Sequence, residues 1–191
     1  MLPRDALVVA ARDISAGPRD GVAFRLILAR YAATALSSIG SLRAGSRYDM
    51  RDQFEVLYLA SSPVTALREV EALVQTDGGL RGVKGPPRIL LSVDYHLQAV
   101  LDLTEVAVQH VFGTSVVELC APWRTLNDGG VPAPTQILGQ VLHGQGSIEA
   151  LRVPSARDPA TDNLVIFPDR LQAGSTVRVF DDSGVIDAHL P

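Results

Sequence analysis

The chain has 191 residues, 47% of them hydrophobic and 5% aromatic, which fits one globular domain over residues 1–191. Seventeen Lys and Arg against 21 Asp and Glu give a net charge of -4, which argues against the basic surface that direct nucleic-acid binding requires. No apolar run approaches the roughly 20 residues that cross a bilayer, and acidic residues interrupt the N-terminal segment. We therefore expect a cytoplasmic protein without membrane contact.

Short apolar segments with the composition of strands recur along the chain. They lie at residues 22–28, 56–60, 88–93, 148–153, 164–167 and 176–180. We expect them to pair into one or two curved sheets, antiparallel or mixed.

The clearest predicted helix follows Ser62, a good N-cap, and starts with Pro63, whose missing N–H costs nothing at that position. An apolar stripe at helical spacing follows, formed by Val64, Leu67, Val70 and Leu73 or Val74. Gly78 and Gly79 predict the end of this helix.

Weaker helical patterns cover residues 104–112, 115–126 and 135–143, and Pro134 and Gly144 flank the last of them. The segment 78–87 is rich in glycine and proline, and we expect an exposed, mobile loop there. Helices and strands follow one another without regular alternation. This order predicts an α+β fold rather than a doubly wound sheet.

Several common kinds of site are missing from the sequence. Cys120 is the only cysteine, which excludes an internal disulfide and a cysteine-built zinc site, and we interpret it as a structural thiol. The four histidines are too scattered to form a ligand pair at helical spacing, so no metal is expected. A Gly-x-Ser-x-Gly nucleophile motif and a phosphate-binding glycine loop are also missing.

Charged and aromatic residues gather instead in the first third of the chain. They are Arg25, Arg43, Arg47, Tyr58 and Glu69. Guanidinium groups bind a diphosphate in bidentate fashion, an aromatic face stacks on a nicotinamide ring, and a carboxylate stabilises a developing ribosyl cation. Such a set suits glycosyl transfer from a cationic leaving group.

Two of these residues have a second interpretation. Arg25 lies between Phe24 and Leu26 in a strand, and it either faces solvent or points into a site. Glu69 lies near the edge of the apolar stripe, so it projects either to water or into a cleft beside the sheet.

Four ordered motifs resemble the RES family, the toxin component of bacterial RES–Xre toxin–antitoxin pairs. They are FRL at 24–26, GSRYD at 45–49, LYLASSPVTALREV at 57–70 and VPSARDPATDNLVIFPD at 153–169. The resemblance implies a fold similar to diphtheria-toxin-type ADP-ribosyltransferases and an activity that degrades NAD. It also implies inhibition by an Xre-type antitoxin, and a homodimer within that complex stays open.

The resemblance assigns roles to individual residues. Glu69, Arg47 and Tyr58 are the expected catalytic residues, with Glu69 stabilising the ribosyl cation, Arg47 holding the diphosphate and Tyr58 stacking near the nicotinamide. The expected substrate-binding residues are Arg25, Arg43, Tyr48, Ser155 and Asn163.

The expected function is a toxin that cleaves the nicotinamide–ribose bond of NAD, as a phosphorylase or a glycohydrolase. NAD is a substrate and not a cofactor, and inorganic phosphate is a candidate co-substrate. The alternatives are an ADP-ribosyltransferase that modifies a protein and a binding module without turnover. One departure concerns the second motif, because the family often reads Gly-Gly-Arg-Trp-Asn where this chain has Ser46, Tyr48 and Asp49.

Overall fold

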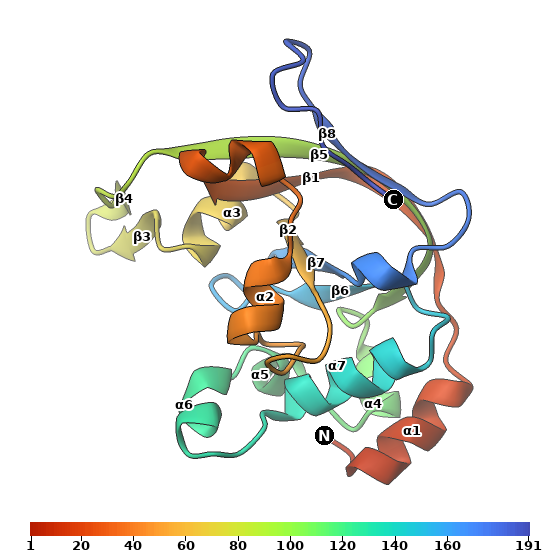
Figure 1. The fold of residues 1–191 in the computed structure, drawn as a ribbon. Coiled ribbons are helices and arrows are strands. Elements are labelled where there is room, and N and C mark those ends of the chain that lie inside the picture. The colour runs from red at the N-terminus through yellow and green to blue at the C-terminus, as the bar shows by residue number, and fades with distance from the viewer.

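Seven strands of the computed structural model, which describes residues 1–191, form one sheet that curls back on itself (Figure 1). The long strands β1 (Gly17–Leu28) and β5 (Arg88–Asp102) pair antiparallel along most of their length. β1 also meets β2 (Leu57–Ala60) through one pair, Phe24 and Ala60, so the order β1-β2-β7-β6-β5 closes on itself. The other strands of this sheet are β6 (Ala150–Pro154), β7 (Asp162–Ile166), β8 (Thr176–Phe180) and β9 (His189–Leu190).

One face of the sheet carries an apolar core of 15 buried residues. Alternate positions on neighbouring strands supply it: Ala23 on β1 lies opposite Val93 on β5, which lies opposite Val179 on β8. Because successive side chains of a strand point to opposite faces, the residues between these positions face the other way. Phe180, one position after Val179, is accordingly 64% exposed.

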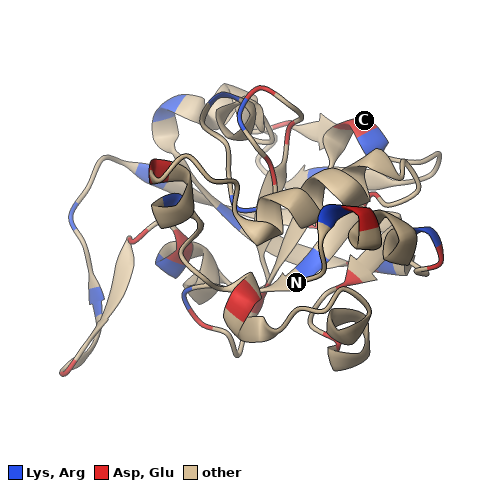
Figure 2. Cartoon of the chain, turned by 90° about the horizontal axis from the view of Figure 1, so that it is seen from below, with Lys and Arg blue, Asp and Glu red and all other residues tan.

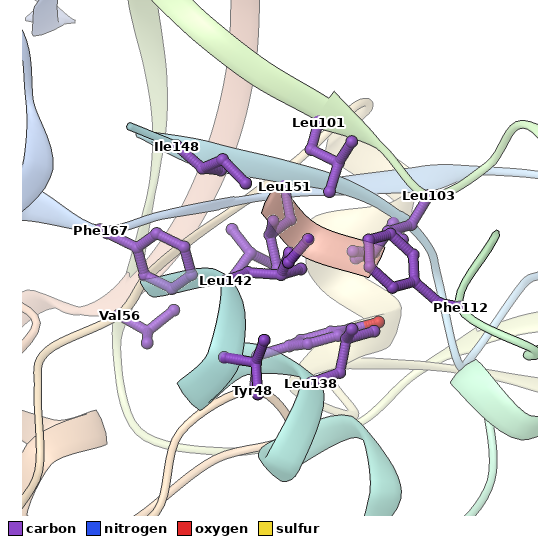
Figure 3. Close-up of a cluster of buried hydrophobic side chains, with 14 of the residues drawn as sticks. Tyr48, Val56, Leu101, Leu103, Phe112, Leu138, Leu142, Ile148, Leu151 and Phe167 are labelled. Carbon is purple, nitrogen blue, oxygen red and sulfur yellow. The ribbon is translucent and has the colours of Figure 1, made fainter. Parts of the chain in front are cut away.

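Helices cover the other face of the sheet around a second apolar core (Figure 3). The longest helix, α7 (Pro134–Gly144), contributes Leu138 and Leu142, which lie one helical turn apart and belong to the same cluster as Leu151 of β6. α1 (Arg4–Arg12) packs along α7 and adds Leu7 to this core.

The remaining helices are short. They are α2 (Ile39–Ala44), α3 (Pro63–Glu69), α4 (Val106–Val111), α5 (Val116–Leu119) and α6 (Trp123–Asp128), with two 3-10 helices at Ala29–Thr34 and Pro168–Arg170. No helix is long and apolar enough to pass through a bilayer. Basic and acidic residues are interspersed along the ribbon in Figure 2.

All six expected strands are present, and β8 has the bounds that the sequence predicts. The strands expected at 22–28 and 88–93 are longer, because β1 and β5 continue along each other. Only β5 and β6 run parallel, whereas every other pair is antiparallel. The α+β class and the curved mixed sheet are therefore confirmed.

The helix expected to run to the glycines at 78 and 79 is shorter than predicted, because α3 ends at Glu69. Glu71 adopts a φ of 55°, and the N–H of Ala72 donates to the carbonyl of Leu67 at 2.9 Å. A left-handed residue followed by a bond back across the last turn is a common helix stop. Glu69 consequently lies at the end of a helix rather than in its middle.

The chain after α3 forms a hairpin of β3 (Leu73–Thr76) and β4 (Gly79–Gly82). The loop expected over 78–87 therefore begins as a strand. The prediction of one helix over 115–126 is also wrong, since α5 and α6 are separate. Pro122 precedes α6, and a proline there cannot donate the hydrogen bond that a continuous helix needs.

Candidate functional site

Glu69 owes its position to a short, well-started helix. The Ser62 hydroxyl accepts a hydrogen bond from the N–H of Thr65 at 3.0 Å, and Pro63 occupies the first helical position. α3 packs against β1 and β2, and Thr65 and Ala66 are buried. The helix therefore holds Glu69 at its C-terminal end beside the sheet.

The Glu69 carboxylate accepts two hydrogen bonds at one oxygen. The Ser155 hydroxyl lies 2.6 Å from Oε1, and the side-chain amide nitrogen of Asn163 lies 2.7 Å from the same atom. Ser155 Oγ accepts the N–H groups of Arg157 at 3.2 Å and Asp158 at 3.3 Å, so its own proton is directed to Glu69. The other carboxylate oxygen, Oε2, makes no hydrogen bond and is free to face a ligand.

The loop that carries Ser155 is tied to α3 by two ion pairs. Arg68 of the helix pairs with Asp158, and Arg157 of the loop pairs with Glu71. Ser155 itself is fully buried. These contacts keep the Ser155 hydroxyl and the Glu69 carboxylate together, although 86 positions separate them in the sequence.

The GSRYD loop at 45–49 approaches α7 closely. Gln136 of α7 donates from Nε2 to the carbonyls of Ser46 at 2.9 Å and Asp49 at 3.2 Å. A Cβ on Gly139 would lie 1.8 Å from the Tyr48 carbonyl oxygen, so no larger residue fits there in this arrangement. The loop conformation therefore depends on two α7 residues that lie about 90 positions further along the chain.

Arg47 reaches from this loop to the end of α5. Its Nη1 donates to the carbonyls of Leu119 at 3.0 Å and Ala121 at 2.5 Å. Burial raises the pKa of the Cys120 thiol, while Arg47 lowers it and Glu69 raises it. Arg47 is held by the carbonyls of the two residues that flank Cys120, and the Cys120 Sγ lies 3.6 Å from the Ser155 carbonyl oxygen. The structure brings Arg47, Glu69 and Ser155 together around this thiol.

Tyr58 joins the group through the GSRYD loop. Its hydroxyl lies 2.7 Å from Ser46 Oγ and accepts the backbone N–H of Tyr48 at 3.2 Å. Burial raises the pKa of Tyr58 above its usual range, while its bond to Ser46 and the Arg47 charge lower it. Tyr58 lies two positions before Ala60, the cross-strand partner of Asn163, so the two side chains share a face of the sheet.

Arg25 makes no hydrogen bond or ion pair with this group. It lies between Ala23 and Ile27 on β1 and shares the face of the 15-residue core. Nη2 donates to the Ser37 carbonyl at 2.8 Å, whereas Nη1 is buried without a partner. Burial lowers the pKa of Arg25 to about 10, and no carboxylate pairs with it. Arg25 is half-buried on the core face, and a partly buried cation without a counter-ion favours an anionic ligand.

Two expected substrate-binding residues lie in positions that do not support that role. Arg43 is exposed and makes no side-chain bond. Tyr48 is fully buried in the helical core of Figure 3, with its hydroxyl unpartnered among apolar side chains. A groove of about 280 Å³ between α3 and the ends of β1 and β5 contains none of the expected site residues.

Replacing Tyr48 by phenylalanine is expected to raise the free energy of unfolding by about 1 kcal/mol, because it removes a buried hydroxyl without a hydrogen bond. Chemical unfolding of both proteins measures this change. An unchanged KM for the substrate would agree with the buried position of Tyr48. A several-fold higher KM would instead support the original assignment to substrate binding.

Sequence reasoning did not predict the parts of the site that packing supplies. The sequence predicts only a structural role for Cys120, and Gln136 and Gly139 carry no signal except their place in a helical pattern. Asp49 stood out only as a departure from the resembling motif. It is fully buried, and burial raises the pKa of its carboxyl to about 7.

Comparison with known proteins gives two kinds of match. Residues 22–188 match the family described as RES domain. Seven chains of solved structures match, one of them from the crystal structure of the M. tuberculosis MbcT–MbcA toxin–antitoxin complex. That chain is 18% identical, with a TM-score of 0.63, and the match covers 93% of this chain and 90% of that chain. This likeness shows a shared fold. Comparison with curated proteins gives no match.

Proposed function

The chain belongs to the RES domain family, and on this basis we propose that it is an enzyme that cleaves the nicotinamide–ribose bond of NAD. In this reaction the bond between the ribose carbon and the pyridinium nitrogen breaks, and its electron pair neutralises the nicotinamide ring. Positive charge then develops on the ribose until an acceptor oxygen adds. The site must supply a fixed negative charge near that carbon and cations for the diphosphate.

The observation that carries this proposal is the arrangement around Glu69. Two donors, Ser155 and Asn163, converge on Oε1 and fix the orientation of the carboxylate. Oε2 has no partner and presents the negative charge to a ligand. A carboxylate fixed in this way stabilises a ribosyl cation without having to reorganise during the reaction.

The arginines fit the rest of the substrate. Arg47 uses Nη1 for backbone carbonyls, which fixes its guanidinium and leaves Nη2 and Nε for a diphosphate oxygen. Arg25, half-buried and without a counter-ion, is a second cationic group, but it lies on the face of the sheet opposite Tyr58 and Asn163 and bonds to the Ser37 carbonyl. Tyr58 supplies the aromatic ring that stacks near the nicotinamide. We also propose that the fold is of the diphtheria-toxin ADP-ribosyltransferase type.

We further propose that the protein acts as a toxin and that a cognate Xre-type antitoxin neutralises it. The support is the RES domain match together with the similar chain from a toxin–antitoxin complex. A partner that places a carboxylate or backbone carbonyls against Arg47 would block the diphosphate position. Whether the protein forms a homodimer within that complex is a separate proposal.

Induced expression in bacteria is expected to lower cellular NAD at least several-fold and to arrest growth. The physical reason is that one enzyme turns over many NAD molecules. NAD extracted from the cells measures the effect, and expression of an antitoxin encoded beside the gene should restore both NAD and growth. Growth arrest with a normal NAD level would point to another target. If the neighbouring protein bound this chain more weakly than micromolar, the proposal of a cognate antitoxin would be contradicted.

Inorganic phosphate is the expected acceptor, and the product is then ADP-ribose with a phosphate on the anomeric carbon. Phosphorolysis needs an anion position besides the one for the diphosphate, and Arg25 and Arg47 are held by different segments of the chain. NAD loss should be several-fold faster with millimolar phosphate than without it. Equal rates with free ADP-ribose as the product would indicate a glycohydrolase. Transfer of the ADP-ribosyl group from labelled NAD to a protein would indicate a transferase.

A further inference from the structure

A chain of three hydroxyl and carboxyl groups connects the buried Asp49 with Tyr58. Ser46 Oγ bonds to Asp49 Oδ1 on one side and lies 2.7 Å from the Tyr58 hydroxyl on the other. The Tyr58 oxygen also accepts the backbone N–H of Tyr48 at 3.2 Å. Asp49 Oδ2 is buried and makes no hydrogen bond. Ser46 is therefore the only side chain through which the Asp49 carboxyl is linked to its neighbours.

No cation compensates the Asp49 carboxyl. From β2 it is approached by Tyr58, and its chain neighbour Tyr48 is a second buried titratable group, whose pKa burial also raises. From α7 it is approached by Gln136, which is uncharged and bonds to the Asp49 backbone carbonyl. The neighbouring Arg47 directs its guanidinium to the end of α5. Burial accordingly raises the pKa of Asp49 to about 7, with a smaller opposing effect from a backbone hydrogen bond.

The charge on Asp49 sets the direction of the hydrogen bonds in this chain. An ionised carboxylate only accepts, so Ser46 must donate to Asp49, and Tyr58 must donate to Ser46. The Tyr58 proton then lies in the hydrogen bond to Ser46 and cannot be donated to a ligand. With a proton on Oδ1, Asp49 donates to Ser46, and Ser46 donates to Tyr58. The Tyr58 oxygen then accepts from Ser46 and from the Tyr48 N–H, and its own proton is free.

We propose that Asp49 is a positioning residue that acts through Ser46 to decide whether the Tyr58 hydroxyl can donate to a bound ligand. The ligand group would be a hydrogen-bond acceptor, such as a carboxamide or phosphate oxygen. The switch between the two states takes up one proton from solvent and rotates two hydroxyl groups. This role rests on the proposed function, because it concerns the side chain that we place beside the nicotinamide.

The connection can be tested without substrate by NMR of protein labelled with ¹³C in the carboxyl carbon of Asp and the ζ carbon of Tyr. One Asp signal should titrate with a midpoint near pH 7, and the Tyr58 signal should shift with the same midpoint. Asp49→Asn should remove both changes, and Ser46→Ala should abolish the Tyr58 shift while Asp49 still titrates. Asp52→Asn is a matched control at an exposed position whose φ of 61° suits Asn, and it should leave both changes intact.

The inference is overturned if the Asp49 carboxyl titrates below pH 5, or if Tyr58 fails to follow Asp49 in the wild-type protein. Both readings use wild-type protein, so they stand even if a variant does not fold.

In an NAD assay, the KM of the wild-type protein should rise about five- to tenfold from pH 6 to pH 8, the usual effect of losing one hydrogen bond. Asp49→Asn should show no such step. A lack of NAD turnover with intact NMR coupling would count against the proposed function and not against this connection.

Discussion

Replacing Glu69 by glutamine is expected to lower kcat for NAD cleavage about 10²- to 10³-fold, the usual effect of removing one preorganised electrostatic group. The amide keeps the size of the side chain but cannot neutralise a ribosyl cation. Its carbonyl oxygen can still accept the hydrogen bonds that Ser155 and Asn163 donate to Oε1, so the variant removes the charge and keeps these contacts. Initial rates at saturating NAD, measured beside circular dichroism and thermal unfolding, would separate lost chemistry from lost fold.

Glu105→Gln is the matched control for this experiment. Glu105 is exposed at the start of α4, and its side chain makes no hydrogen bond or ion pair. At this position the same chemical change should leave kcat within about twofold of the wild-type value, since surface substitutions have small effects. If Glu69→Gln retained the wild-type rate as well, the negative charge of Glu69 would have no part in the reaction.

Replacing Gly139 by alanine is expected to destabilise the protein by roughly 3 kcal/mol or more and to abolish activity. The added Cβ would lie 1.8 Å from the carbonyl oxygen and 2.7 Å from the carbonyl carbon of Tyr48. Backbone atoms cannot move aside as a flexible side chain can. The loop would have to leave α7, and Ser46 and Arg47 would move with it.

Gly144→Ala tests the same change at the end of the same helix, where an added Cβ meets nothing within 4 Å. Alanine there should leave the stability equal or slightly higher, because it restricts the unfolded chain more than glycine does. Urea unfolding of both variants gives the comparison. Equal stability of the two variants would show that the 45–49 loop does not pack against α7 as described.

The strands could be predicted from the sequence because each depends on a local pattern. In β8, residues 177 and 179 are buried between exposed neighbours, and this alternation is visible in the sequence. The end of α3 could not be predicted in this way. The apolar stripe continues past Glu69, and nothing in the local sequence indicates the left-handed conformation of Glu71 that follows the helix.

The sequence does not predict α1, for a related reason. Acidic residues in and beside residues 4–12 argue against membrane targeting, and no other local signal stands out. Leu7 and Ala11 lie one turn apart and are buried beside α7, which is a helical pattern too short to stand out in the sequence. Short helices of this kind gain most of their stability from packing, and packing partners cannot be identified from local sequence.

The candidate site also combines residues that the sequence identifies with residues that only tertiary packing brings in. The resemblance named Glu69, Ser155 and Asn163 from three motifs, and the structure places them in direct contact. Gln136 and Cys120 enter through tertiary packing alone, and no spacing in the sequence connects them with Arg47. The alternation of the strand leaves the interpretation of Arg25 open, and only the structure shows its Nη1 buried and its Nη2 donating to the Ser37 carbonyl.

The measurement that most directly tests the account is the release of nicotinamide from NAD by the purified protein, followed by chromatography with mass identification of both products. We expect one nicotinamide for each NAD consumed, with the ADP-ribosyl product in equal amount. The release should fall about 10²- to 10³-fold in Glu69→Gln and remain unchanged in Glu105→Gln. Intact NAD after prolonged incubation with the folded wild-type protein, with and without phosphate, would contradict the account.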